Sequence, residues 1–65
     1  MPIVKVELFP GRSAKTKAEL AKAITETLER VGGINPEATT VLFVEVPGDA
    51  WFVAGEPLAG APAGS

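Results

Sequence analysis

The sequence predicts a small α/β (α+β) protein in which one long helix connects two parallel strands and a short C-terminal hairpin follows. Three features of the chain support this prediction. An alternating apolar segment comes first, a run of helix-forming residues with regularly spaced apolar positions follows it, and a nearly continuous β-branched segment comes third. Strand, helix and strand in this order form a β-α-β unit, whose crossover is right-handed by strong default.

The first predicted strand covers residues 3–8, where side chains alternate between two faces. Val4, Val6 and Leu8 fall on one face, and the other face is mixed, because it carries Ile3 with a lysine and a glutamate. A period of two with β-branched residues indicates a half-buried strand. The Phe-Pro-Gly stretch that follows contains a turn signal, so the strand is expected to end there.

A helix is predicted from residue 14 to about residue 31. Ser13 stands directly before a run of helix-forming residues, which makes it a candidate N-cap. The apolar residues recur every three or four positions and define one side of the helix: Leu20, Ala21, Ile24, Leu28 and Val31. Gly32 and Gly33 follow, and a glycine can adopt the left-handed conformation that ends many helices.

The second predicted strand covers residues 39–46, with the sequence TTVLFVEV. An apolar run of this length between turn signals indicates a strand covered on both faces. After a Pro-Gly-Asp turn at residues 47–49, residues 51–53 form a short aromatic segment suited to a hairpin. We expect a single domain over residues 1–58, followed by a tail rich in Gly, Ala and Pro at residues 59–65.

The length and composition predict self-association. A chain of 65 residues forms one domain, and so small a domain usually needs disulfides, a metal or oligomerisation for stability. The chain has no cysteine and no histidine, which removes disulfides and nearly every transition-metal site. A lone β-α-β unit also leaves a sheet face and a sheet edge uncovered. The sequence therefore predicts a homo-oligomer without a transition-metal site.

The charge and hydropathy patterns exclude other classes of partner. The net charge is −2 and the six cations are scattered, so binding to nucleic acid is not expected. No apolar stretch approaches the roughly 20 residues of a membrane span. The N-terminus has neither the charged segment nor the long apolar segment of a signal peptide. We therefore expect a soluble, cytoplasmic protein.

Without histidine and cysteine, the candidate bases are carboxylates, lysines and the N-terminal amine. Glu7 and Glu45 lie on the predicted strands, but solvated glutamates on a strand face are commoner than catalytic pairs. Removal of Met1 would leave Pro2 with a free amine. An α-amine titrates at about pH 8, and apolar surroundings would lower its pKa further, toward the range that proton abstraction next to a carbonyl requires. The structural alternative is that Pro2 only begins a strand.

Arg12 follows the turn after the first strand, at the opposite end of that strand from Pro2. About ten residues at 3.3 Å each put it too far from its own Pro2 for one small substrate. An oligomer would bring Arg12 of one subunit to Pro2 of another, where a guanidinium binds a carboxylate bidentately. The alternative is a surface arginine near the helix start. Trp51 is open to two interpretations as well, a core or interface residue or an apolar wall beside the amine.

Several short motifs of the chain occur in a specific order and spacing. They are the Pro-Ile start, the triplet Gly11-Arg12-Ser13, the long helix with Lys17, the strand end Val44-Glu45, and the pair Gly55-Glu56. Together, over about residues 2–58, they resemble the 4-oxalocrotonate tautomerase family. The resemblance implies a β-α-β tautomerase-like protomer that commonly assembles as a hexamer, a trimer of dimers, and that works without a cofactor.

The resemblance also implies site residues. Pro2 matches the amino-terminal proline that acts as general base in keto-enol tautomerisation. Arg12 matches the arginine that binds a substrate carboxylate from a neighbouring subunit, and Trp51 matches an active-site aromatic. Thr40 stands where the family has a second arginine, and losing that cation removes a stabiliser of the developing enolate worth several kcal/mol. A small monocarboxylate or neutral enol is therefore a better expected substrate than a dicarboxylate.

Two other functions remain open at this point. The chain resembles subunits of mixed hexamers that lack part of the arginine set, which makes a weakly active or non-catalytic partner subunit the main alternative. Some relatives are dehalogenases that use a glutamate near the aromatic position to activate water. Val53 or Ala54 matches that glutamate here, so a dehalogenase is disfavoured.

Overall fold

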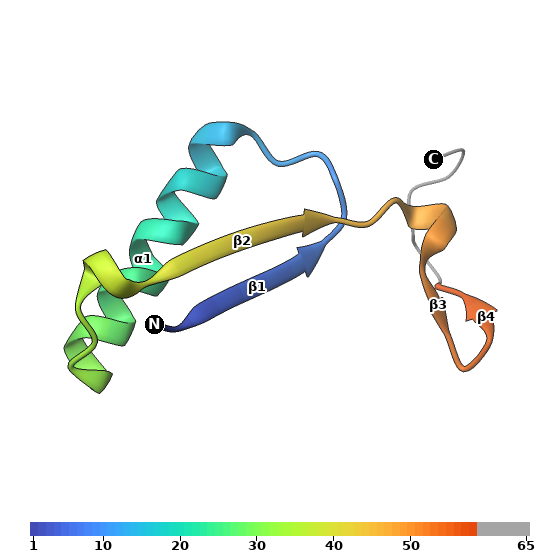
Figure 1. Ribbon diagram of the computed structural model, residues 1–65. Helices are drawn as coiled ribbons and strands as arrows, with labels where there is room; N and C mark the ends of the chain where they lie inside the picture. Colours follow the sequence, from blue (N-terminus) through green and yellow to red (C-terminus); the bar gives the residue numbers. More distant parts are fainter. Residues whose placement is uncertain (59–65) are drawn as a thin grey trace.

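The computed structural model describes residues 1–58 and confirms the predicted α/β fold (Figure 1). The predicted tail at residues 59–65 lies outside the described residues. In chain order the elements are β1 (Ile3–Leu8), α1 (Ala14–Gly32), the 3₁₀ turn η1 (Pro36–Ala38), β2 (Thr40–Glu45), the 3₁₀ turn η2 (Gly48–Ala50), β3 (Phe52–Val53) and β4 (Glu56–Pro57). No helix among the described residues is long and apolar enough to cross a membrane.

The strands β1 and β2 are parallel neighbours, as predicted. Their register places Ile3 beside Thr40 and Leu8 beside Glu45. Two backbone hydrogen bonds extend the ladder at its ends. The Thr40 N–H donates to the Pro2 carbonyl at 3.0 Å, and the Val46 N–H donates to the Leu8 carbonyl at 2.8 Å. The amino end of β1 is thus fixed to β2 from the second residue of the chain.

Both predicted ends of α1 are confirmed. The Ser13 side chain accepts a hydrogen bond from the Thr16 N–H at 3.1 Å, which satisfies one of the unpaired donors of the first turn. At the other end Gly33 adopts the left-handed conformation, with φ 66° and ψ 22°. Its N–H donates to the Glu29 carbonyl at 2.9 Å. A residue with a Cβ would be strained in this conformation.

The apolar side of α1 is only partly as predicted. Ala21, Ile24 and Leu28 are half-buried, as expected. Leu20 is exposed, and Val31 is 72% exposed because it lies in the last turn, which extends past the amino ends of the strands (Figure 1). Lys17 is half-buried and continues the stripe toward the start of the helix instead.

The helix covers one face of the two-stranded sheet and leaves the other open (Figure 1). The open face carries Ile3, 67% exposed, and Leu42, 44% exposed, together with Val44. The sequence predicts this open face for a lone β-α-β unit, and cover of the second strand on both faces stays a prediction for the oligomer. Within residues 1–58 no apolar side chain reaches full burial.

The predicted hairpin is confirmed and extends beyond the carboxyl end of β2 (Figure 1). β3 and β4 are antiparallel, with Val53 beside Glu56. Ala54 and Gly55 connect them, and both have positive φ values, 55° and 79°. Positive φ at both central residues is the requirement of a type I′ turn, whose twist matches that of the flanking strands.

Candidate active site

Pro2 and Thr40 lie together at the amino end of the sheet. Pro2 is half-buried, and its carbonyl accepts the hydrogen bond from Thr40 described above. Met1, which precedes it, is 95% exposed. Because the Pro2 carbonyl is hydrogen-bonded to β2, the Pro2 nitrogen lies at the outer end of the sheet. We call Pro2 and Thr40 the amino-end half-site.

Arg12 and Trp51 lie at the opposite, carboxyl end of the sheet and are linked through Phe9. The rings of Phe9 and Trp51 pack with their centroids 4.3 Å apart at an interplanar angle of 48°. An Arg12 guanidinium nitrogen (Nη1) donates to the Phe9 carbonyl at 3.5 Å, the long limit for a hydrogen bond. Arg12 is exposed, and the structure of residues 1–58 contains no salt bridge to it. We call Arg12 and Trp51 the carboxyl-end half-site.

The two half-sites do not meet within one chain. They are separated by the length of β1, about 17 Å at 3.3–3.4 Å for each step from residue 3 to residue 8. A near-attack geometry needs reacting atoms about 3–3.5 Å apart. A substrate held by Arg12 therefore cannot reach the Pro2 of the same chain, which is the separation that the sequence predicts.

A hollow of about 300 Å³ lies beside Trp51 on the carboxyl-end half-site. Its lining residues come from β1 and from the segment that runs from the residue after β2 through η2 to β3: Glu7, Val46, Ala50, Trp51 and Phe52. This volume is at the lower end of the range for small-molecule sites. Glu7 could not be placed beside Trp51 from the sequence, because its neighbours depend on the path of the segment after β2.

The two strand glutamates lie on opposite faces of the sheet, so they form no carboxylate pair in this chain. Glu7 is beside Val44 on the open face, and Glu45 is beside Leu8 on the helix-covered face. Glu45 is partly exposed at the end of the covered face, and its carboxylate forms a salt bridge with Lys17. The Lys17 Nζ lies 2.8 Å from the Glu45 Oε2.

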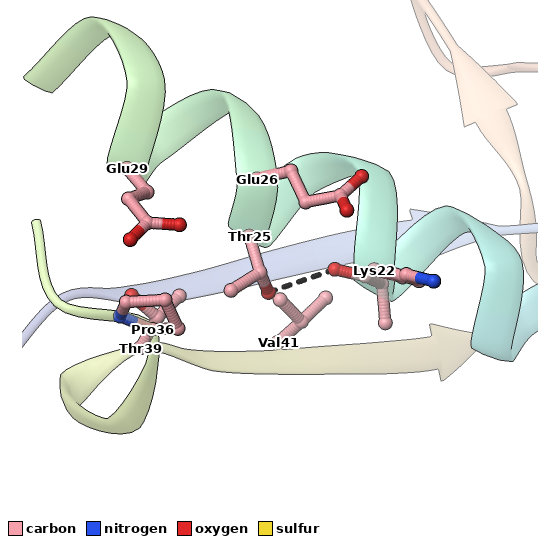
Figure 2. Close-up of a pocket in the computed structure, with 8 residues that line it drawn as sticks. Lys22, Thr25, Glu26, Glu29, Pro36, Thr39 and Val41 are labelled. Atoms are coloured by element: carbon pink, nitrogen blue, oxygen red, sulfur yellow. Dashed lines mark hydrogen bonds between the residues drawn. The ribbon is translucent and has the colours of Figure 1, made fainter.

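A larger, open groove of about 510 Å³ lies between α1, η1 and β2 (Figure 2). Its polar lining includes Lys22, Glu26 and Glu29, and its floor includes Val41. The Thr25 hydroxyl donates to the Ala21 carbonyl at 2.8 Å, so it is already used within the helix. None of the four predicted site residues lines this groove. The described residues also contain no group of three or more acidic residues placed to hold a metal ion.

The fold and the two half-sites define a β-α-β protomer with a proline at one end of its sheet and an arginine with an aromatic residue at the other. Comparison with known families agrees with this class. The profile of the family described as "Tautomerase enzyme" matches residues 2–61, nearly the whole chain. The chain belongs to the tautomerase family, a family of isomerases.

Individual relatives support the same assignment. A probable tautomerase of Streptococcus thermophilus is 41% identical over 56 residues, which cover 86% of this chain and 92% of the relative. A probable tautomerase of Lactococcus lactis is also 41% identical over the same shares of both chains.

Solved structures extend the comparison to the fold. TomN, a 4-oxalocrotonate tautomerase homologue in the tomaymycin biosynthetic pathway, superposes with a TM-score of 0.81 at 36% identity, over 89% of each chain. YwhB, another homologue of 4-oxalocrotonate tautomerase, superposes with a TM-score of 0.82 at 30% identity. That match covers 94% of this chain and all of YwhB.

Proposed function

We propose that the protein is a cofactor-independent tautomerase that acts on a small enol or 2-oxo acid, with Pro2 as the general base after removal of Met1. The observation that carries the proposal is the position of Pro2. Its carbonyl is fixed by Thr40, its nitrogen is at the outer end of the sheet, and the preceding Met1 is exposed to processing. The free secondary amine would stand in a defined place at the amino end of the sheet.

The proposed reaction moves one proton from an oxygen to a carbon of the substrate and leaves Pro2 unchanged at the end. The neutral amine of Pro2 takes the proton of the enol hydroxyl while the C–O bond gains double-bond character and the electron pair of the C=C bond moves toward carbon. The resulting ammonium then returns its proton to that carbon, which gives the keto form and the neutral amine. General base catalysis of this kind contributes about 10²–10⁴-fold to the rate.

We further propose that the complete site forms between subunits of a homo-oligomer built from dimers, with a hexamer as the expected assembly. The separation of the half-sites supports this, because Arg12 and Trp51 would reach the Pro2 of a neighbouring subunit. The open apolar face of the sheet needs a cover. An apolar groove of about 350 Å³ also lies along α1 and beside Val4. It is near the edge of β1 that is not paired with β2.

The substrate class follows from the charges of the site. Arg12 supplies one cation for one carboxylate, whereas Thr40 offers a hydroxyl in place of a second cation. A hydroxyl donates a hydrogen bond to an oxyanion but does not neutralise it. We therefore propose a small monocarboxylate, or a neutral enol, rather than a dicarboxylate.

The alternative is a weakly active or non-catalytic partner subunit of a mixed tautomerase-family hexamer. The observation that favours it is the same lack of a second cation at Thr40. This alternative predicts little activity of the protein alone and a gain when it is mixed with a second family member. A dehalogenase remains disfavoured, because the position expected to activate water is Val53 or Ala54.

The test replaces Pro2 in a protein whose N-terminus is known. Intact mass spectrometry first establishes removal of Met1, because a retained Met1 makes the proline nitrogen a non-basic amide. Pro2→Ala is expected to lower kcat for the enol of phenylpyruvate about 10²–10⁴-fold while the oligomer stays intact. Pro36→Ala, a proline outside both half-sites, is the matched control. Full activity of Pro2→Ala would refute the mechanism.

A further inference from the structure

One charged pair is inserted between the helix and the covered face of the sheet. Lys17 is in the first turn of α1, and Glu45 is the last residue of β2. Their charged atoms are 2.8 Å apart, and the side chains are only 28% and 38% exposed. The other lysines of the described chain, by contrast, are exposed.

Both residues occupy positions that the packing pattern otherwise fills with apolar side chains. Lys17 stands one turn before Ala21 on the half-buried stripe of α1, and Glu45 follows Phe43 with the period of the covered face. A partly exposed ion pair contributes little to stability, and an apolar pair of similar volume stabilises the fold as well or better. Stability alone therefore does not account for two charges at this position.

The pair joins the two segments that carry the carboxyl-end half-site. Arg12 lies directly before the helix N-cap, and the Lys17 N–H donates to the Ser13 carbonyl at 3.1 Å within the same turn. On the other side, Glu45 leads through η2 to Trp51. A shift of the first turn of α1 relative to the end of β2 would therefore move Arg12 relative to Trp51.

The apolar packing of α1 on the sheet lies further along the helix, at Ala21, Ile24 and Leu28. The Val46-to-Leu8 backbone bond and the Phe9–Trp51 packing hold the start of the loop at residues 9–13. Beyond them the loop contains Gly11, with a φ of 123°, and Arg12 itself has only the long bond to the Phe9 carbonyl. Among the described residues, the salt bridge is the polar contact that joins the first turn of α1 to the end of β2.

We propose that Lys17 and Glu45 are positioning residues, which hold Arg12 in register with Trp51 so that its guanidinium meets a substrate carboxylate in bidentate geometry. This inference rests on the proposed function, because it concerns the carboxylate anchor of that same site. Neither residue touches the substrate. The pair affects binding of the carboxylate, and proton transfer at Pro2 of the neighbouring subunit is left unchanged.

The experiment breaks the pair from both sides and then rebuilds it. Lys17→Met and Glu45→Gln are each expected to raise KM for the enol of phenylpyruvate about three- to tenfold, because small misplacements of a binding group weaken substrate positioning. The value of kcat should stay within about twofold, and KM for a neutral enol of similar shape, such as the methyl ester, should not change.

Three further variants separate positioning from general packing. The charge swap Lys17→Glu with Glu45→Lys should restore most of the carboxylate KM, and Lys17→Arg should keep it, because both retain an ion pair. Lys22→Met removes an exposed lysine of the same helix and is the matched control. Should Lys17→Met fail to fold, Glu45→Gln is nearly isosteric and provides the same measurement.

Two results would overturn the inference. One is an equal rise in KM for the carboxylate and its ester, which means a general loss of structure. The other is a swap variant that is no better than the single variants. Failure of the proposed function has a different signature, since Pro2→Ala would then retain activity. If Pro2→Ala loses activity while the Lys17 and Glu45 variants keep the wild-type KM for both substrates, only the positioning role is refuted.

Discussion

Truncation of Arg12 tests the carboxylate anchor with little disturbance of the fold. Arg12 is exposed, its one described hydrogen bond is 3.5 Å long, and no salt bridge within residues 1–58 involves it. Arg12→Ala should therefore change the melting temperature very little. Its effect should appear in substrate binding instead, because the substrate carboxylate would lose its charge-assisted contact with the Arg12 guanidinium.

The size of the effect follows from the energy of that contact. A hydrogen bond to a charged group contributes about 1.5–3 kcal/mol, and every 1.4 kcal/mol corresponds to a factor of ten. Arg12→Ala should accordingly raise KM for a carboxylate enol by about 10- to 100-fold. The neutral ester of the same enol has no carboxylate to lose, so its KM should change less than about twofold.

The assay compares both substrates with the variant and with a matched control. Steady-state ketonisation of the enol acid and its ester is followed in wild type, Arg12→Ala and Arg30→Ala. Arg30 is the chain's other arginine, exposed in the last turn of α1, at the opposite end of the helix from Arg12. Equal changes for acid and ester, or an Arg30→Ala effect as large as that of Arg12→Ala, would refute the anchoring role.

Two further predictions address the second anchor and the assembly. Thr40→Arg adds a cation at the amino-end half-site, so kcat/KM for a dicarboxylate enol should rise at least about tenfold relative to kcat/KM for a monocarboxylate enol. Thr40→Gln is the uncharged control. An unchanged ratio of the two kcat/KM values in Thr40→Arg would contradict the proposed substrate class. Leu42→Glu places a charge on the open apolar face, so sedimentation should show smaller species than wild type. Lys15→Glu on the exposed helix surface is its control, and an unchanged assembly of Leu42→Glu would mean that this face is not an interface.

Local sequence patterns were enough to predict most of the fold. The alternation around Val4 and Val6 depends only on which face of β1 is covered, and the cap residues Ser13 and Gly33 act on their own helix turns. Val31 shows where such patterns stop being informative. It has the right helical spacing, but its burial depends on how far the strands extend beneath the last turn of α1, which periodicity does not encode.

The Lys17–Glu45 pair was missed for a related reason. Within the run TTVLFVEV, a nearly continuous apolar pattern does not say which residues face the helix, so Glu45 looked like a solvated glutamate. The register with β1 places it on the covered face. A signal was present in the sequence, since Lys17 and Glu45 each break an apolar stripe, and both breaks fall at the same end of the β-α-β unit.

In the candidate site too, the features that depend on the local sequence could be predicted, and those that depend on how distant segments pack could not. Pro2 and Arg12 could be singled out because their chemistry is unusual for a chain without histidine or cysteine. Their distance could be predicted as well, since it is the length of one strand. The two ends of one strand lie at opposite ends of the sheet, so the proposed base Pro2, directly before β1, and the proposed anchor Arg12, after it, cannot meet within one protomer. The proposed self-association would therefore serve catalysis as well as stability, and Leu42→Glu on the open face is expected to impair both.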